Sequence, residues 1–318
     1  MSIKLQDAKK TKHRWTKDDT ELTLLAAPTT IWYVLFSFLP MFGIIISFKE
    51  FRINGNFIAS VFRSPWAGGN GLKNFESLFK FGDIWIIIRN TLLYNSVFII
   101  LGIIIPVILA LLINQLHSRR IAKIYQTAMF MPYFLSWVVV ATTVWGFLSY
   151  DKGLLNNLIE SFGGERLQWY MQPQYWPFFL TFMNLWKSVG YGMVVYLAAI
   201  TGIDVTYYEA AVIDGATKWQ QTKYITLPLM KTVIVIMFIL SVGRIFYSDF
   251  GLFYQVPQAS NSLFNVTYTI DVYVYSMMKS GTTGMAAAAA LIQSTVGCIT
   301  ILLANFIVRK IDSESAMI

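Results

Sequence analysis

The stretch GMAAAAALIQSTVGCITILLANFIV, residues 284–308, contains no Asp, Glu, Lys, Arg or His and is followed directly by Arg309 and Lys310. About 20 mainly apolar residues are enough for an α-helix to cross the hydrocarbon core of a bilayer. The stretch therefore predicts a membrane-spanning helix.

Five further runs along the chain meet the same criterion. The six predicted spans are residues 22–48, 91–113, 125–148, 178–203, 233–253 and 285–308. Pro28, Pro40 and Pro106 predict kinks in the first two, because membrane helices tolerate proline where neighbours satisfy the freed backbone groups. The expected fold class is an all-α membrane protein with six transmembrane helices. Residues 1–21 form a basic N-terminal tail, 22–309 the transmembrane domain, and 310–318 a short C-terminal tail.

Composition supports a membrane protein over a soluble one. Of 318 residues, 56% are hydrophobic and 13% charged, against roughly 45–50% and about 25% in soluble domains. A soluble chain of this kind would expose large apolar patches, which argues against an ordinary cytosolic enzyme. The single cysteine, Cys298, excludes an internal disulfide scaffold, and His13 and His117 are too far apart in sequence to suggest a metal motif.

The net charge of +8 arises from basic residues that cluster in particular segments. Short cytoplasmic segments of membrane proteins are enriched in Lys and Arg. The basic residues fall in the N-terminal tail, in the second-to-third and fourth-to-fifth connections and at the end: Lys4, Lys9, Lys10, Lys12, Arg14, Lys17, Arg119, Arg120, Lys123, Lys218, Lys223, Lys231, Arg309 and Lys310. We expect both termini on the cytoplasmic side, and we interpret the surplus as a topology signal and not as a nucleic-acid surface.

The connection between the fourth and fifth predicted spans reads TYYEAAVIDGATKWQQTKYITLP over residues 206–228. Thr206 with Glu209 three residues later suggests a capping box at a helix start, and Gly215 suggests a turn. A second short helix over residues 216–225 would end before Leu227 and Pro228. An amphipathic hairpin lying in the membrane interface is the simpler alternative.

The spacing of this loop resembles the EAA motif of permease subunits in binding-protein-dependent ABC importers, which is E-A-A, three residues, G, nine residues, I-x-L-P. The matching positions, with the D-G-A often found inside the motif, are Glu209, Ala210, Ala211, Asp214, Gly215, Ala216, Ile225, Leu227 and Pro228. Two positions differ, since Thr222 stands where an aromatic residue is common and Thr232 where a second proline is common. These differences put in doubt only the packing of the second short helix.

Other segments are similar to carbohydrate-type permeases, particularly the LplB-like group that imports oligosaccharides and polysaccharides. They are GLKNFESLF, MPYFLSWVVVATTVW, DVYVYSMM and LLANFIVRK. The resemblance implies a type I importer permease in a bacterial cytoplasmic membrane, with the EAA loop as a coupling helix seated in an ATPase cleft. Glu209 and Asp214 would accept hydrogen bonds from the ATPase, and Gly215 would permit the turn. Ala210 and Ala211 would keep the contact face small, and Pro228 would stiffen the connection to the fifth span.

The same resemblance implies the partners. These are a second, homologous permease in a heterodimer, two ATPase subunits that use ATP and Mg, an extracellular solute-binding protein and the lipid bilayer. It implies no cofactor or metal bound by this chain and no nucleic acid.

Polar residues inside the predicted spans are candidates for a substrate pathway. Lys187, Arg244, Asp249, Arg89 and Asn95 are of this kind, although Lys and Arg side chains also snorkel to the interface. A sugar needs flat apolar faces and hydrogen-bonding groups, which aromatic and amide side chains supply. We therefore select Asn184, Trp186, Tyr191, Tyr247 and Arg244, while packing and interfacial aromatic belts would give similar clusters.

No catalytic residue is expected. The chain has no G-x-x-x-x-G-K-[ST] phosphate loop, so it is not itself the ATPase, and known hydrolase and metalloprotease motifs are missing. Three alternatives stay open: a permease for another small solute, a secondary transporter or channel, which should show an ion relay or repeats, and a membrane enzyme. The last would need a polar catalytic cluster, and its nearest acidic residues, Asp151 and Asp271, are isolated in sequence.

Overall fold

The computed structural model describes residues 15–80 and 82–311, and the regular elements in this part are helices, with one isolated β-bridge between Lys49 and Trp66. The α-helices are α1 (Lys17–Tyr33), α2 (Leu39–Met41), α3 (Phe57–Arg63), α4 (Lys73–Lys80), α5 (Ile84–Asn114), α6 (Arg119–Phe130), α7 (Trp137–Leu148), α8 (Leu154–Ser161), α9 (Trp176–Thr201), α10 (Val205–Ile213), α11 (Lys218–Gln221), α12 (Leu227–Val242), α13 (Phe264–Thr267), α14 (Ile270–Lys279) and α15 (Thr283–Ile311). Short 3₁₀ or π segments join them: η1 (Val34–Phe38), η2 (Phe42–Phe48), η3 (Met131–Phe134), η4 (Trp169–Met171), η5 (Pro173–Tyr175), η6 (Thr222–Thr226), η7 (Gly251–Gln255) and η8 (Asn261–Leu263).

The described residues contain enough long apolar helix for four to six membrane spans. Four helices qualify individually, over Lys17–Phe48, Ile84–Asn114, Lys218–Val242 and Thr283–Lys310. Two bent pairs qualify as well, and counting each pair as one span gives the six that the sequence predicts. The basic tail before residue 15 and the last seven residues of the C-terminal tail lie outside the described residues.

The structure corrects two predicted spans. The third, 125–148, is not one straight helix, because it bends by 97° between η3 and α7. The fifth, 233–253, is wrong as one continuous helix, since α12 ends at Val242, residues 243–246 form a turn, residues 247–249 have no regular structure, and helix resumes at Phe250. By contrast α5 continues as one helix across Pro106.

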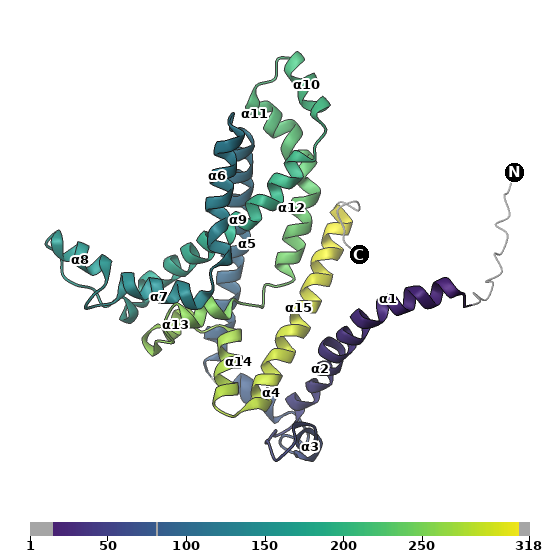
Figure 1. The fold of residues 1–318 in the computed structure, drawn as a ribbon. Coiled ribbons are helices and arrows are strands. Elements are labelled where there is room, and N and C mark those ends of the chain that lie inside the picture. The colour runs from purple at the N-terminus through teal and green to yellow at the C-terminus, as the bar shows by residue number, and fades with distance from the viewer. Residues whose placement is uncertain (1–14, 81, 312–318) are drawn as a thin grey trace.

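The helices α5 and α9 pack along much of their length at the centre of the molecule (Figure 1). Gly190 of α9 permits a close approach to α6, because a Cβ atom there would overlap the backbone of Met129. Small residues have the same role in α15, where Ala286 and Ala288 are buried. Small residues thus allow close helix packing here, as is common in membrane proteins.

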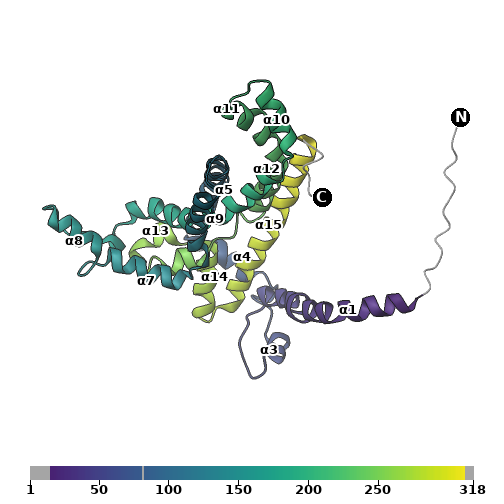
Figure 2. The ribbon, with the colours of Figure 1, turned by 45° about the horizontal axis from the view of Figure 1, so that its top comes forward.

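The helix α1 lies apart from this bundle. It runs away from the other helices in both views (Figures 1 and 2), and none of its side chains is buried. Its N-terminus is formed by a capping box in which Thr16 and Asp19 exchange hydrogen bonds. Its apolar side chains therefore meet surroundings outside this chain.

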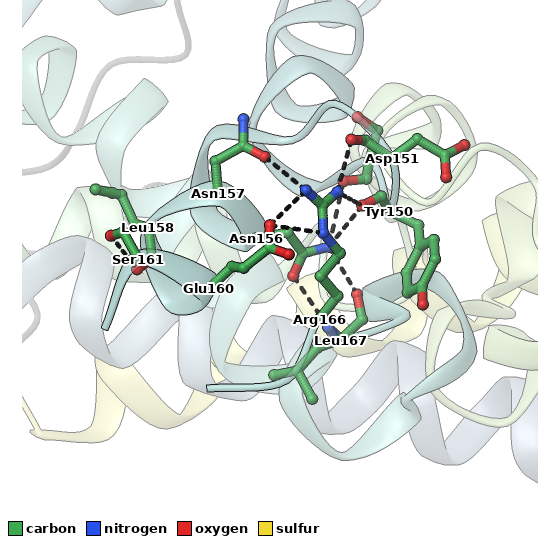
Figure 3. Close-up of polar contacts among 10 residues, drawn as sticks. Tyr150, Asp151, Asn156, Asn157, Leu158, Glu160, Ser161, Arg166 and Leu167 are labelled. Carbon is green, nitrogen blue, oxygen red and sulfur yellow. Dashed lines mark hydrogen bonds and ion pairs between the residues drawn. The ribbon is translucent and has the colours of Figure 1, made fainter. Parts of the chain in front are cut away.

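A lobe over residues 149–176, which includes α8, projects from the opposite side of the molecule (Figures 1 and 2). The buried Asn156 amide donates to the carbonyl oxygens of Ser149, Tyr150 and Leu167 and accepts from the Leu167 backbone and the Trp169 indole. Arg166 binds Glu160 at 2.6 Å and the carbonyl oxygens of Tyr150 and Asp151 (Figure 3). This lobe is thus a small folded unit and not a loose loop.

Candidate functional sites

The helix α10 begins two residues earlier than the sequence suggests. Its N-cap is Asp204, whose carboxylate accepts from the Thr206 backbone N–H at 3.0 Å, so the predicted Thr206–Glu209 capping box is wrong. An Asp at the N-cap is as favourable as Thr, and it leaves Glu209 free of a local partner. The Thr206 backbone N–H, and then its hydroxyl, hold the pKa of the Asp204 carboxyl below its ordinary value.

The C-terminus of α10 is a Schellman motif centred on Gly215. The Ala216 N–H donates to the Ala211 carbonyl at 2.8 Å and the Gly215 N–H to the Val212 carbonyl at 3.0 Å. Gly215 has a φ of +77°, which an L-residue adopts only with strain. A Cβ atom there would meet no other atom of the chain. Within this chain, glycine is needed for the backbone conformation and not for space.

The second half of the loop is not a short helix that stops before Leu227. Thr217 forms a capping box with Gln220, and α11, η6 and α12 then follow without interruption from Lys218 to Val242. The π-helical turn η6 precedes Pro228 and contains a Leu227 N–H bond to the Thr222 carbonyl. Such a turn shifts the backbone bonding just before the proline, which has no N–H to offer. Pro228 therefore lies near the start of α12 without interrupting the continuous helix Lys218–Val242.

We call residues 204–226 the α10–α11 hairpin, which lies at the end of the molecule opposite α4 and α14 (Figures 1 and 2). Two side-chain bonds fix its base. The Tyr208 hydroxyl bonds Thr226 at 2.9 Å, and Gln115 at the end of α5 donates to Thr222 at 3.3 Å. Thr222, which departs from the motif, is thus buried and bonded to a neighbouring helix.

The hairpin exposes apolar side chains. Ile213 is 87% exposed and Trp219 70%, and Tyr207 and Val212 are also exposed. Glu209 and Asp214 are exposed, and neither carboxylate has a partner among the described residues. Ala210 is exposed, whereas Ala211, Ala216, Ile225 and Leu227 are half-buried. The surface combines bare apolar groups with free acceptors.

The bend of the third span brings an aromatic cluster beside a lysine of α9. Lys187 Nζ donates to the Tyr133 carbonyl at 2.8 Å and lies 5.5 Å and 5.4 Å from the ring centroids of Tyr133 and Trp137. The ring of Tyr191, one turn further along α9, stacks on Tyr133 with centroids 5.0 Å apart. Phe130 stacks on Tyr133 from the same helix–turn segment. Tyr191 is the selected residue that lies in this cluster.

The interruption of the fifth span, residues 243–249, is held by side chains of other helices. Asn95 of α5 donates to the carbonyl oxygens of Ile245 and Tyr247 at 2.7 and 3.0 Å. Gln293 of α15 donates to the Phe246 carbonyl at 2.8 Å. Asp271 of α14 accepts from the Ser248 N–H at 2.6 Å, from its hydroxyl and from Gln293. The two interruptions meet where the Trp137 indole donates to Asp249 at 2.6 Å.

The other selected pathway residues lie in different surroundings. Tyr247 is partly exposed and donates to Ser294 of α15 at 3.0 Å. Arg244 is exposed at the start of the interruption, and its guanidinium has no partner in the described part of the chain. Asn184 shares the face of α9 with Lys187 and Tyr191 by its spacing. Trp186 lies elsewhere, in a largely apolar groove between α7 and α9.

No group of three or more His, Cys, Asp and Glu side chains within residues 15–80 and 82–311 is arranged to hold a metal ion. Among the described residues, the candidate sites consist of aromatic rings, amides, single charged side chains and backbone groups in turns.

A family model described as the inner membrane component of binding-protein-dependent transport systems matches residues 102–313. The chain belongs to this family. It is an inner-membrane, multi-pass permease of an ABC importer, which is a transport subunit and not an enzyme, and permease subunits of this family carry no cofactor.

Relatives and solved structures match the permease over nearly its whole length. The polygalacturonan/rhamnogalacturonan transport system permease protein YteP of Bacillus subtilis is 33% identical, over 92% of this chain and 89% of the relative. Protein LplB of the same organism is 32% identical, over 94% and 91%. A crystal structure of a bacterial ABC transporter involved in the import of the acidic polysaccharide alginate has a chain that is 31% identical, with a TM-score of 0.81, over 93% of this permease and 97% of that chain.

Sequence reasoning missed several residues of the permease that the structure brings together. In the sequence, Tyr133 and Trp137 stand only in a segment that resembles carbohydrate permeases, and no pattern marks Gln293. Asp271 is isolated from other acidic residues in the sequence. Lys187 and Asn95 did give a signal, as polar residues in apolar runs, but their partners lie on distant parts of the chain.

Proposed function

We propose that this permease forms part of the pathway by which an oligosaccharide, or a fragment of a polysaccharide, enters the cell after delivery by an extracellular solute-binding protein. The names of the relatives support a saccharide, since YteP is named for polygalacturonan and rhamnogalacturonan and the similar crystal structure belongs to an alginate importer. The exposed rings of Tyr191 and Tyr247 fit such a substrate, because aromatic faces suit the C–H surfaces of sugars. Asn184, Trp186 and Arg244 complete the proposed pathway.

The observation that carries the mechanism is the α10–α11 hairpin, a rigid turn with a bare surface at one end of the bundle. In the proposed assembly it is the coupling helix, seated in a cleft of an ATPase subunit. Ile213 and Trp219 would be covered there, and Glu209 and Asp214 would accept hydrogen bonds from the ATPase. Ala210, Ala211 and Ala216 keep this contact face small, and Ile225, Leu227 and Pro228 join it to α12.

The proposed complex contains a second, homologous permease and two ATPase subunits, which bind and hydrolyse ATP with Mg. Closure of the ATPases would shift each hairpin as a rigid body and so re-orient the helices attached to it. The hairpin and both termini then lie on the cytoplasmic side, in agreement with the basic residues of these segments. On this proposal residues 22–309 act as one domain, and in the structure α1 already begins at Lys17 and α15 continues to Ile311.

The test compares two glycines with the same geometry. Gly215 ends α10 and Gly163 ends α8, each in a Schellman motif, with φ of +77° and +81° and with open space around the missing Cβ. Gly215→Asp and Gly163→Asp therefore impose the same local strain, on the hairpin and on the lobe respectively. We expect Gly215→Asp to abolish uptake and saccharide-stimulated ATP hydrolysis in proteoliposomes, and Gly163→Asp to retain both.

A second pair tests the acceptors. Glu209→Lys should prevent co-purification of the ATPase, whereas Glu165→Lys, an exposed carboxylate of the lobe, should not. Retained uptake in Gly215→Asp would contradict the coupling role. A stable wild-type preparation that contains no ATPase subunit would contradict the importer assembly.

A further inference from the structure

Lys187 is a cation in the middle of a predicted span, and the protein leaves its charge unbalanced. Its ammonium group has three N–H donors, of which one is directed to the Tyr133 carbonyl at 2.8 Å. No carboxylate of the described residues lies within 4 Å of Nζ. Trp137, whose ring faces Lys187, also contacts a carboxylate, that of Asp249. This carboxylate accepts hydrogen bonds from the Trp137 indole and from the Gly251 N–H, the latter at 2.9 Å.

The surroundings of Lys187 lower the cost of the charge without neutralising it. The faces of Tyr133 and Trp137 attract the cation, and the carbonyl belongs to the end of η3, where a positive charge is favoured. A charged side chain at such a depth is costly unless it is paired or serves a pathway. A glutamine would satisfy the Tyr133 carbonyl without this cost, so the charge itself requires an explanation.

Beside the cation lies a stacked pair of rings that is partly exposed. Tyr133 and Tyr191 are stacked at 15° to one another, and Phe130 stacks on Tyr133 at 10°. Tyr133 is 43% exposed and Tyr191 45% exposed. A partly exposed aromatic surface next to a cation with free N–H donors suits a ligand that carries both an apolar C–H face and a carboxylate.

We infer that Lys187, with the rings of Tyr133 and Tyr191, forms a subsite for a uronate residue of the transported saccharide. The rings take the C–H face of the sugar, and the Lys187 ammonium binds its carboxylate. The inference rests on the proposed function and narrows its substrate class to acidic saccharides. A polygalacturonan permease and an alginate importer among the similar proteins agree with it.

The experiment uses the complete transporter in proteoliposomes with its solute-binding protein. The substrates are an oligogalacturonate and the same oligomer fully methyl-esterified, which differ only in the carboxylate charge. The variants are Lys187→Gln, which keeps a donor for the Tyr133 carbonyl, Lys187→Arg, which keeps the charge, and Lys152→Gln, which removes an exposed lysine of the lobe. Because one binding protein serves all variants, ratios between them report on the permease.

We expect Lys187→Gln to lower kcat/KM for the oligogalacturonate by about 10-fold or more, the scale of one charge-assisted hydrogen bond, and to leave the ester within about 3-fold. Lys187→Arg should retain most of the preference, and Lys152→Gln all of it. Titration calorimetry of the purified transporter without binding protein should give the same loss in Kd, and it replaces the transport assay if the binding protein rejects the ester.

Equal losses for both oligomers in Lys187→Gln, or no loss for either, would overturn the inference and leave Lys187 as a cap for η3. Wild-type transport of neutral but not acidic oligosaccharides would overturn it as well, while the proposed function stands. A wild-type transporter that moves no saccharide would overturn both.

Discussion

The two interrupted spans meet the same physical requirement in different ways. Between η3 and α7 only Leu135 and Ser136 leave the helix, whereas after α12 the chain leaves the helix over residues 243–249, as a turn followed by residues without regular structure. In the first case the chain supplies its own caps, since the Leu135 N–H bonds the Pro132 carbonyl and the Ser136 hydroxyl accepts from the Val139 N–H. In the second, three consecutive carbonyl groups depend on Asn95 and Gln293 of other helices.

The two interruptions therefore suit different uses. A backbone group left unpaired in a membrane is costly, so a long interruption must be satisfied from outside and becomes tied to the helices that satisfy it. A short interruption is satisfied by its own residues, so the aromatic rings beside it can remain partly exposed. The interruption at 243–249 is thus a fixed junction of α5, α14 and α15, and the bend at residues 135–136 presents exposed side chains.

The largest effect should come from Asn95→Leu. The change leaves the carbonyl groups of Ile245 and Tyr247 without a donor, and a buried unsatisfied group costs about 1–3 kcal/mol. We expect the thermal midpoint of the purified transporter to fall clearly and uptake to be lost. The control, for the thermal midpoint alone, is Asn184→Leu, an amide on α9 that makes no side-chain hydrogen bond among the described residues; an equal fall in midpoint there would contradict the special role of Asn95.

Gly251→Ala should have the next largest effect, because it disturbs the point where the two interruptions meet. An added Cβ atom would overlap the Trp137 side chain, which must then move and lose its bond to Asp249. Overpacking of this kind costs about 1–3 kcal/mol. Gly146→Ala in α7 places its Cβ in open space and should not lower the thermal midpoint; similar values for both variants would mean that the junction is loosely packed.

Asp271→Asn should have a smaller effect on the second interruption. The carboxylate becomes an amide whose N–H groups face the donor Gln293, and charge-assisted bonds to Ser248 become neutral ones. The expected cost is about 1 kcal/mol, the difference between charged and neutral hydrogen bonds. Thermal unfolding with the double variant Asp271→Asn, Asn95→Leu should show non-additive losses, because both residues hold one segment. Additive losses of stability would show that Asp271 and Asn95 act independently, which would contradict this prediction.

The smallest effect should come from Ser136→Ala, which removes only the local cap of α7. The Ser136–Val139 contact is long, at 3.3 Å, so the loss belongs at the lower end of the N-cap range, about 0.5–1 kcal/mol. The measurement is again the thermal midpoint. A loss as large as that of Asn95→Leu would show that the bend depends on this cap far more than the contacts indicate.

Much of the fold was predictable from sequence, because apolar length alone identifies helices that cross a bilayer. The turn at Gly215 was predictable as well, since only glycine readily adopts its φ. The interruptions were not, because apolar residues lie on both sides of Pro132 and Gly243, and polar residues such as Arg244 and Asp249 indicate a pathway as readily as a break in a helix. Their satisfaction depends on pairs such as Asn95 with Ile245, which are distant in the chain.

The helix start at Asp204 shows a second limit. Asp204 and Thr206 both suit an N-cap, and sequence spacing with Glu209 favoured the wrong one. The subsite around Lys187 was half predictable, because Lys187 and Tyr191 share a face of α9 but Tyr133 comes from a bend that no local pattern announces.

The uninterrupted helix from Lys218 to Val242 has a mechanical consequence. At 1.5 Å per residue it is a rod of roughly 37 Å, with the α10–α11 hairpin at one end and Arg244 just beyond the other. A helix resists compression along its axis. If the proposed function holds, a displacement of the hairpin by the ATPase is transmitted in full along the helix to the segment that follows Val242. On that proposal, ATP binding at one end of this helix and sugar binding near the other end are coupled, so that each affects the other.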